Sequence, residues 1–443
     1  MNTSRYVCPE RAELSIIAAP IGPALPPLIV DAPPTGEMPM PRSHPIHLAA
    51  LAIPFLLACS EQSPVDPNVA ARVSPQPSAR ASALVWKTEL TGTIANDADY
   101  AIYVPTNWNG DVVFYAHGIV PPLAPVALPG PGDWDDAAAL RDGLGQAGYA
   151  VAYSSFSENG YAIKDGVQRT HQLRGVFNSR VGRPRRSFLV GHSLGGQVVQ
   201  ALAETYPDQY DGALAMCGVL GGTRLQTDYI GHARTLFDLF YPGVLPGSTM
   251  EMPVTITNVV TQIQNPVIGA VMANPTGFGL IAASRQVQLA GTNTTELLTS
   301  LINALAYHAI GVNDLLARTH GHILFDNSTT VYDSPIYPAA FYAAVNQNVR
   351  RYTATADALA WLENNYEPSG DLRIPMITLH KTQDRLVPYR HEAAYAARVS
   401  AAGASANLLQ RSQNAFGHCD LGVPEILQNF SDLVGWVNTG VKP

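Results

Sequence analysis

The sequence has 443 residues, and its 27 Lys and Arg against 35 Asp and Glu give a formal net charge of −8. This acidic balance argues against a nucleic-acid partner, because binding a phosphate backbone requires clustered basic side chains. Apolar residues make up 47% of the chain and charged residues only 14%, so a large packed core can form. The length fits about three domains, or a single α/β unit with insertions.

The N-terminal region contains a short apolar run at residues 48–58, which follows Arg42 and ends at Cys59. Eleven residues match the apolar region of a signal peptide and are too few to span a bilayer, which takes about 20. The last four residues, Leu56-Leu57-Ala58-Cys59, resemble the bacterial lipobox, in which the cysteine carries the lipid. We therefore expect a lipoprotein signal peptide at residues 38–58 and lipid attachment at Cys59. The alternative is a buried thiol in an apolar leader.

Residues 1–37 do not resemble the start of a signal peptide, because they contain acidic residues and many prolines. We interpret them as a mis-annotated extension that is not translated, with Met38 or Met40 as the start, which would make Cys8 irrelevant. Residues 59–82 are rich in Pro, Ser, Ala and Gln without apolar periodicity, a composition that predicts a disordered tether.

From residue 90 onward, short apolar runs alternate with helical patterns, which predicts an α/β sheet. The expected strands are residues 90–94, 100–104, 112–116, 150–153, 187–190, 213–216, 377–379 and 407–410. The expected helices between them are residues 135–147, 167–180, 197–206, 391–402 and 424–437.

The alternation of strand and helix patterns is interrupted by residues 223–371, a segment of 149 residues. Helical patterns are expected there at residues 230–240, 295–310 and 339–364. A segment of this length is not a bare loop. We predict a mainly helical cap inserted into a core formed by residues 83–222 and 372–443.

The turn Gly191-His192-Ser193-Leu194-Gly195 follows an expected strand and precedes an expected helix. This is the pattern of a nucleophile elbow, in which glycines allow the strained turn that exposes the serine. On this motif the chain resembles the α/β-hydrolase superfamily, and more narrowly its secreted bacterial serine esterases and lipases. The resemblance covers residues 90–443 and implies an α/β-hydrolase fold with a mostly parallel central sheet.

The resemblance also implies a catalytic acid and a catalytic histidine further along the chain. Asp384, directly after the strand at residues 377–379, matches the acid, and His418, after the strand at residues 407–410, matches the histidine. The chain order Ser193, Asp384, His418 is that of the superfamily. Asp371 and Asp228 are the alternative acids, the first placed before the strand and the second after an earlier one.

An acyl-transfer site also needs donors for an oxyanion. The resemblance implies the backbone N–H of Leu194, after the nucleophile, and a second N–H at Ile119, after the pair His117-Gly118. His117, His192 and Tyr161 are candidate substrate-binding residues at the same edge of the sheet.

In this fold Cys217 and Cys419 both lie at the carboxyl ends of neighbouring strands, and a disulfide between them fits an oxidising compartment. The adjacent His418 and Cys419 are similar to the tannase and feruloyl-esterase family, whose disulfide links cysteines beside the serine and the histidine. This chain departs from that pattern, because His192 and not cysteine precedes Ser193. Two unpaired buried thiols are the alternative.

The resemblance implies neither a metal nor an organic cofactor, and the pair His320 and His322 has no third ligand at useful spacing. We expect a carboxylic-ester hydrolase acting through an acyl-enzyme on a small-molecule or polymeric ester. Its expected location is outside the cytoplasm, anchored by lipid to a bacterial membrane at the periplasmic or cell-surface side. The alternatives are a peptidase or amidase with the same fold, and a surface lipoprotein that binds without catalysis.

Overall fold

The computed structural model describes residues 84–95, 97–130, 137–365 and 367–443. The expectations for residues 1–37, the signal peptide, the tether and Cys59 lie outside the described residues. Within the described part of the chain, no single helix is long and apolar enough to cross a membrane. The segments Val260–Ala273 and Pro275–Ala283 reach that length and composition only as a pair, which is bent by 107° at the break.

The centre of the molecule is an eight-stranded sheet with the strand order β1-β2-β4-β3-β5-β6-β7-β8, in which only β2 runs antiparallel to the others. The strands are β1 (Trp86–Ile94), β2 (Ala98–Pro105), β3 (Asp111–Ala116), β4 (Ala150–Ser154), β5 (Arg186–His192), β6 (Gly212–Met216), β7 (Met376–Gln383) and β8 (Leu408–Phe416). This order and polarity define the α/β-hydrolase fold, as expected from the sequence.

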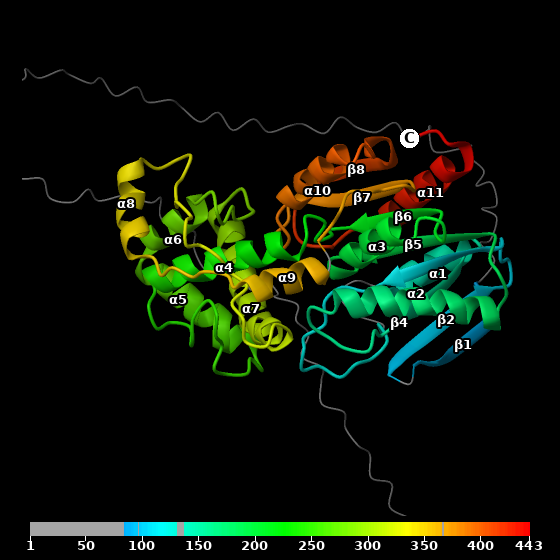
Figure 1. The fold of residues 1–443 in the computed structure, drawn as a ribbon, viewed down its shortest axis with the longest axis horizontal. Coiled ribbons are helices and arrows are strands. Elements are labelled where there is room, and N and C mark those ends of the chain that lie inside the picture. Colours follow the sequence, from blue (N-terminus) through cyan, green and yellow to red (C-terminus); the bar gives the residue numbers. More distant parts are fainter. Residues whose placement is uncertain (1–83, 96, 131–136, 366) are drawn as a thin grey trace, which may run out of the picture. The chain divides into compact units, whose positions relative to one another are not determined.

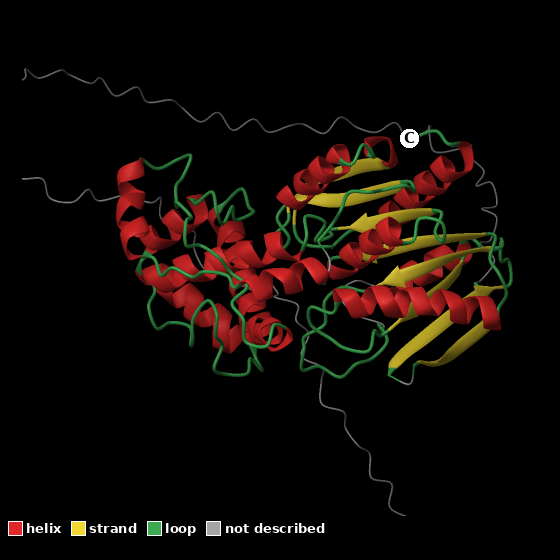
Figure 2. Cartoon of the chain, viewed as in Figure 1, coloured by secondary structure: helices red, strands yellow, loops and turns green. Residues whose placement is uncertain are grey.

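Helices cover both faces of the sheet (Figure 2). They are α1 (Ala137–Gln146), α2 (Ile163–Arg180), α3 (Leu194–Thr205), α10 (Arg390–Ala401) and α11 (Val423–Thr439), with a 3₁₀ turn at Ser405–Asn407. Strand β3 shows why both faces need cover. Phe114 packs in one core with residues of α2 and α3, whereas Val113 and Tyr115 pack in the other with residues of α1 and α11. Such alternation follows from the two-residue period of a strand.

We use the name cap for residues 223–371, which lie between β6 and β7. The cap contains α4 (Thr223–Phe240), a π-helical turn (Val260–Gln264), α5 (Asn265–Ala273), α6 (Pro275–Ala283), α7 (Thr294–Arg318), α8 (Ala339–Asn348) and α9 (Ala356–Asn364). In Figure 1 the parallel strands point toward these helices, so the cap faces the carboxyl edge of the sheet. In this fold, that edge is where functional side chains gather.

The expectation of one helix over residues 339–364 is wrong, because this segment forms two helices, α8 and α9. The residues between them are held extended by Asn327, whose side chain accepts a hydrogen bond from the Tyr352 N–H at 2.6 Å and donates one to the Arg350 carbonyl at 2.9 Å. Thr355 then caps the second helix by accepting from the Ala358 N–H. The backbone at Arg350 and Tyr352 therefore bonds to the side chain of Asn327 in place of helical hydrogen bonds.

Polar contacts join the cap to the loop that follows β4. The backbone N–H of Tyr161 donates to Asp314 of α7 at 2.8 Å. Arg318, also on α7, forms an ion pair with Glu158 at 2.7 Å and donates to the carbonyl of Asn159. The end of α7 is thereby fixed against the carboxyl edge of the sheet.

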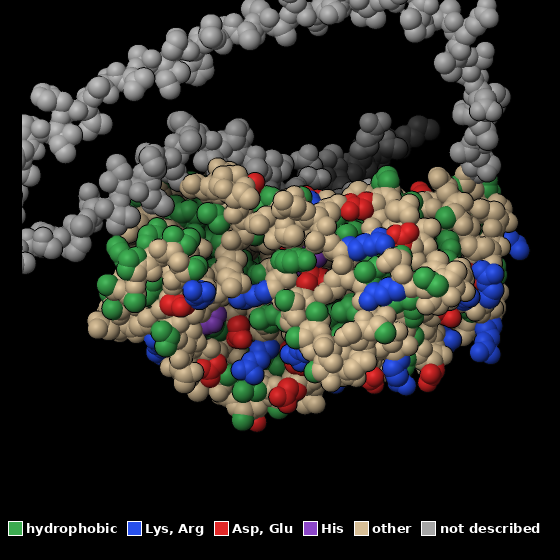
Figure 3. All heavy atoms as spheres, turned by 90° about the horizontal axis from the view of Figure 1, so that it is seen from above, with side chains coloured by type: hydrophobic (Ala, Val, Ile, Leu, Met, Phe, Trp, Pro, Cys, Tyr) green, Lys and Arg blue, Asp and Glu red, His purple; other side chains and the backbone are tan. Residues whose placement is uncertain are grey.

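On the face shown in Figure 3, basic and acidic side chains are interspersed among apolar and neutral ones. No continuous basic surface of the kind that would attract a polyanion is visible on that face.

Candidate active site

Ser193 occupies the sharp turn between β5 and α3. Its backbone has φ 53° and ψ −123°, a conformation that residues with a side chain rarely adopt. The turn is held by hydrogen bonds from the Ser193 N–H to the Met216 carbonyl at 2.9 Å and from the Gly196 N–H to the Ser193 carbonyl at 3.0 Å. The Ser193 side chain therefore projects at the carboxyl end of β5, next to the first turn of α3.

Two glycines of the turn are required by close packing. A Cβ atom on Gly191 would lie 2.3 Å from the Gly195 carbonyl oxygen, and one on Gly195 would lie 2.1 Å from the Ala116 carbonyl oxygen. Strand β5, helix α3 and the end of β3 thus meet at distances that exclude any side chain.

His418 and Asp384 complete a chain of contacts with Ser193. The Nε2 atom of His418 lies 3.0 Å from Ser193 Oγ, and its Nδ1 atom lies 2.7 Å and 2.9 Å from the two carboxylate oxygens of Asp384. All three side chains are almost completely buried. A hydroxyl, an imidazole and a carboxylate joined in this order form the arrangement that activates a serine as a nucleophile.

The carboxylate of Asp384 is held by its own loop and by two histidines. Its Oδ1 atom accepts hydrogen bonds from the backbone N–H groups of Leu386 and Val387, both at 2.9 Å. Burial by itself raises the pKa of Asp384, but the charge of His418 and the hydrogen bonds from His380 and His418 outweigh burial and lower the pKa well below its usual range. The group is therefore an ionised acceptor at neutral pH.

The two alternative acids lie elsewhere. Asp371 is exposed and pairs with Arg373 at 3.7 Å. Asp228 lies on α4 and pairs with Arg224 of the same helix at 4.0 Å. Of the three candidates, Asp384 is the one that contacts His418.

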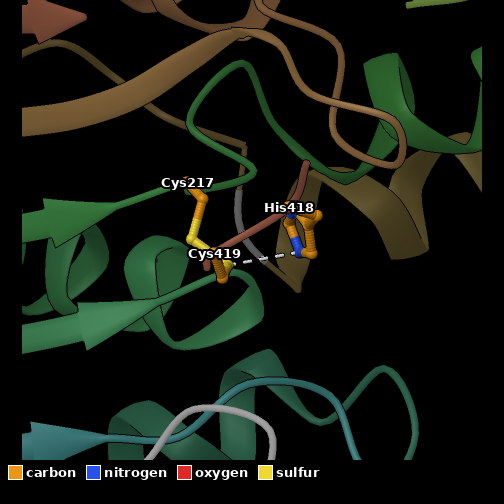
Figure 4. Close-up of side chains that lie close together, drawn as sticks. All are labelled: Cys217, His418 and Cys419. Carbon is orange, nitrogen blue, oxygen red and sulfur yellow. Dashed lines mark hydrogen bonds between the residues drawn. A yellow bond between two sulfur atoms is a disulfide. The ribbon is translucent and has the colours of Figure 1, made fainter. Parts of the chain in front are cut away.

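A disulfide joins Cys217 to Cys419, with Cα atoms 5.4 Å apart, as expected for this fold (Figure 4). The Sγ atom of Cys419 also lies 3.3 Å from His418 Nε2. Both cysteines have positive φ angles, 44° and 55°, so each lies in a tight turn at the end of its strand. The bridge links the loop that carries His418 to the end of β6.

The two residues expected to stabilise an oxyanion lie on either side of the serine turn. Leu194 begins α3, so its N–H is at the positive end of the helix dipole. The segment that leads to Ile119 is in close contact with the turn, because Gly195 packs against the carbonyl groups of Ala116 and His117. The donor roles of the Leu194 and Ile119 N–H groups remain predictions.

The three candidate substrate-binding residues have different surroundings. The His117 ring stacks on Phe156 with ring centroids 3.9 Å apart, and its Nδ1 donates to the Gly118 carbonyl at 2.7 Å. His192 stacks on Tyr115, whose hydroxyl lies 2.8 Å from His192 Nδ1. Tyr161 instead lines a pocket in the cap. Of the three, Tyr161 is the one that lines this pocket.

That pocket is narrow, with a cavity volume of about 30 Å³, and mostly apolar. Its lining residues are Tyr161, Thr227, Ile230, Gly231, Thr249, Met250, Tyr307, His308, Val312, Leu315, Leu324 and Phe325. Tyr307 connects the pocket to the candidate active site, because it also packs against Val219, Leu386 and Val387, beside Asp384.

Within the described residues, the only group of potential ligands close enough to share a metal ion is Cys217, His418 and Cys419, and its two sulfur atoms are bonded to each other. His320 and His322 follow α7, and His322 has Asp357 at 3.6 Å.

Two functional candidates were missed by the reasoning from sequence. His380 lies 3.3 Å from Asp384 Oδ2, and Glu392 lies 3.2 Å from His380. The spacing of His380 four residues before the acid, on a buried strand, could have drawn attention to it. No signal in the sequence identifies Glu392 as its partner.

The sequence matches no protein-family model and none of the curated proteins. Several solved structures are similar. Feruloyl esterase B from Aspergillus oryzae is 14% identical, with coverage of 80% of this chain and 81% of its own and a TM-score of 0.48. The esterase Pf2001 from Pyrococcus furiosus is 10% identical. The match covers 84% of this chain and 98% of the esterase, with a TM-score of 0.40. Est1E from Butyrivibrio proteoclasticus is 12% identical. The match covers 79% of this chain and 98% of Est1E, with a TM-score of 0.37. The fold assignment itself rests on the order and polarity of the strands.

Proposed function

We propose that the protein is a serine hydrolase that cleaves carboxylic esters through an acyl-enzyme. The observation that carries the proposal is the continuous contact from Ser193 Oγ to His418 Nε2 at 3.0 Å and from His418 Nδ1 to Asp384 at 2.7 Å. A serine, a histidine and an ionised carboxylate in this order supply a nucleophile, a base and a group that orients the base.

In the proposed reaction, Ser193 Oγ attacks the ester carbonyl while His418 Nε2 takes the hydroxyl proton. Asp384 holds the imidazole with its Nδ1 proton directed at the carboxylate and stabilises the imidazolium. His418 then gives the proton to the departing alkoxide, and water repeats the sequence to release the acid. The N–H groups of Leu194 and Ile119 are proposed to bind the oxyanion, where each donor lowers the barrier by about 3 kcal/mol.

We propose that the cap pocket accepts an apolar part of the ester. The walls formed by α4 and α7 are largely aliphatic and aromatic, and the pocket is connected through Tyr307 to the loop after Asp384. The Tyr161 hydroxyl, a phenol whose pKa burial raises further, can donate a hydrogen bond at the pocket wall. With a cavity volume of about 30 Å³, the pocket has room only for a short acyl end, so we expect short-chain esters to be cleaved faster than long-chain esters.

We also propose that the protein works outside the cytoplasm, anchored to a bacterial membrane through lipid on Cys59. The apolar run at residues 48–58 with its lipobox-like end supports this location. The disulfide between Cys217 and Cys419 supports it independently, because disulfides persist in oxidising compartments.

The test is hydrolysis of p-nitrophenyl esters from acetate to palmitate by the purified full chain, compared with Ser193→Ala. We expect the variant to lose activity by a factor of about 10⁴ or more, while Ser400→Ala on the exposed side of α10 keeps it. Equal ester hydrolysis by the wild type and Ser193→Ala would overturn the proposal. Folded protein that cleaves amides but no ester would replace esterase by amidase.

A further inference from the structure

A second histidine lies behind the acid of the proposed triad. His380, near the end of β7, is completely buried and has a carboxylate on each side. Its Nε2 atom lies 3.3 Å from Asp384 Oδ2, and its Nδ1 atom lies 3.2 Å from Glu392 Oε1. The contact chain from Ser193 through His418 and Asp384 therefore continues through His380 to Glu392.

Hydrogen bonding determines where the protons of His380 lie. Nε2 also faces the Val387 carbonyl at 3.0 Å, and a carbonyl only accepts, so Nε2 carries a proton. Nδ1 faces a carboxyl oxygen, so one further proton must lie between Nδ1 and Glu392. The pair is thus either an imidazolium with a carboxylate or a neutral imidazole with a carboxylic acid.

The surroundings of Glu392 favour the charged form of the pair. Its Oε2 atom accepts hydrogen bonds from Thr378 Oγ1 and from Gln410 Nε2, both at 2.6 Å, as expected for a carboxylate. Burial by itself lowers the pKa of His380, but the hydrogen bonds and charges of Asp384 and Glu392 outweigh burial and raise the pKa to about 10. The contacts of Glu392 and the direction of this shift both favour the imidazolium form of His380 at neutral pH.

We propose that His380 and Glu392 are positioning residues, a buried ion pair that fixes Asp384 and sets the pH range in which His418 can act as a base. This inference rests on the proposed function, because it assigns the pair a part in the same reaction. The imidazolium of His380 offsets the charge of Asp384, and Glu392 in turn holds His380 through contacts from β7, β8 and α10. The three groups Asp384, His380 and Glu392 together carry one negative charge.

Other titratable and charged groups lie close to Asp384, His380 and Glu392. His391, next to Glu392, is kept neutral because burial, followed by the charges of Arg390 and His380, lowers its pKa well below the usual range. The Tyr389 ring packs edge-on against the His380 ring, with the ring centroids 5.8 Å apart. Tyr229 and Tyr307 lie near Asp384, with Arg390 close to Tyr229 and Arg385 close to Tyr307, and Tyr395 lies near Glu392.

The first experiment is the pH profile of kcat/KM for His380→Gln in the full chain. Removing the cation leaves Asp384 and Glu392 uncompensated, so His418 should hold a proton more strongly. We expect the acid limb of the profile to move to higher pH by about one pH unit, with kcat falling about tenfold and KM changing little. An unmoved acid limb in folded His380→Gln protein would overturn the proposal.

His232→Gln is the matched control. His232 is also a buried histidine hydrogen-bonded at Nδ1, to Tyr332 at 3.0 Å, but it lies in the cap without contact to the triad. It should carry a similar packing cost and leave the acid limb in place. The same displacement of the limb in both variants would mean that loss of packing, and not charge, moves it, and would overturn the proposal.

The role of Glu392 is tested by combining His380→Gln with Glu392→Gln. The double variant removes both charges, so its acid limb should return to within about 0.3 pH units of the wild type although kcat stays low. If the double variant keeps the limb of His380→Gln, Glu392 has no electrostatic part, and the paired role is wrong.

Nitrogen-15 NMR of wild-type protein labelled at histidine keeps the inference testable if the variants fail to fold. At pH 8 we expect one histidine ring with protons on both nitrogens, and this signal should persist above pH 9. Only neutral histidine rings at pH 8 would overturn the charged pair. Wild-type protein that labels with a fluorophosphonate at no residue and cleaves no ester would instead refute the proposed function, while the NMR result would still decide the charge of His380.

Discussion

The serine turn depends on the absence of two side chains as much as on the presence of Ser193. A methyl group at residue 195 would approach the carbonyl oxygens of Ala116 and His117 to 2.1 Å and 2.5 Å. Both atoms belong to the backbone at the end of β3, so neither can rotate away. Relief would require moving β3 away from α3, and with it the segment that leads to Ile119.

We therefore predict that Gly195→Ala lowers the free energy of unfolding by about 3 kcal/mol and kcat/KM by at least about 10²-fold. Gly175→Ala is the control, because Gly175 is exposed in the middle of α2 and a Cβ there would meet nothing within 4 Å. That change should raise the free energy of unfolding by up to about 1 kcal/mol. Urea unfolding and ester hydrolysis measure both effects, and an active, fully stable Gly195→Ala protein would contradict the assigned geometry.

At the residue scale, sequence reasoning reached the residues that the superfamily places by motif or by position after a strand. Ser193, Asp384 and His418 were predicted in this way, and the structure brings them together. His380 and Glu392 escaped because their relation is spatial. Glu392 reaches His380 from α10, and its partner on β8, Gln410, is 18 residues further along the chain.

At the scale of elements, the disulfide connects two strand ends that are 202 residues apart in the chain, a span that includes the whole cap. Cys217 directly follows β6, and Cys419 follows β8 directly after His418. Strand β7 lies between β6 and β8 in the sheet, and the Cα atoms of the bridge are only 5.4 Å apart, so the loop after β8 must cross the end of β7 to bring Cys419 to Cys217. The histidine loop is therefore tied to the sheet independently of its hydrogen bonds.

Replacing both Cys217 and Cys419 by serine should lower the free energy of unfolding by about 2–5 kcal/mol, because the unfolded chain loses a cross-link that closes a long loop. We also expect a lower kcat with little change in KM, since His418 becomes less precisely positioned. Treatment of the wild type with a reductant should move its urea midpoint and its kcat toward those of the variant, and should leave the variant itself unaffected. An unchanged kcat in the reduced, folded protein would separate the bridge from catalysis.

The helices and strands were predicted best where apolar residues recur with a clear period. Helices were missed where no polar residues mark an exposed face. The strands and covering helices of the sheet were expected near their observed positions, although α2 begins at Ile163, earlier than expected. Helices α5 and α6 were missed because Asn265–Ala283 contains no charged residue, so no polar face marks a helix. The break between α8 and α9 depends on Asn327, which no local pattern identifies.

At the scale of the whole molecule, the sheet was predictable and the interior of the cap was not. Parallel strands with covering helices follow from local patterns that many sequences share. The cap core instead joins α4, α5, α6, α7 and α8 through contacts that no periodicity specifies. It also buries polar groups, among them His232 on α4 and His308 on α7.

These buried histidines make the stability of the molecule depend on pH. Burial, followed by the charges of nearby arginines, lowers the pKa of His232 and of His308 to about 3 each, while an unfolded histidine has a pKa near 6.5. Their contribution to stability is present above pH 6.5 and is lost as the pH falls toward 3, because the unfolded chain binds two more protons. His380 has the opposite sign, since its raised pKa adds stability below pH 6.5 that is lost as the pH rises through about 10.

We therefore predict that the free energy of unfolding is greatest near neutral pH and that these two histidines lower it on the acid side, with a slope that approaches about 2.7 kcal/mol for each pH unit well below pH 6.5. Urea midpoints measured between pH 7 and pH 5 should decrease steeply in the wild type. A double variant with His232→Gln and His308→Gln lacks these two proton-binding groups in the unfolded state, so its midpoint should change less over the same range, and His391, whose pKa burial also lowers, accounts for part of the remaining change. Equal slopes for the two proteins would show that His232 and His308 are protonated in the native cap, and that the acid sensitivity arises elsewhere.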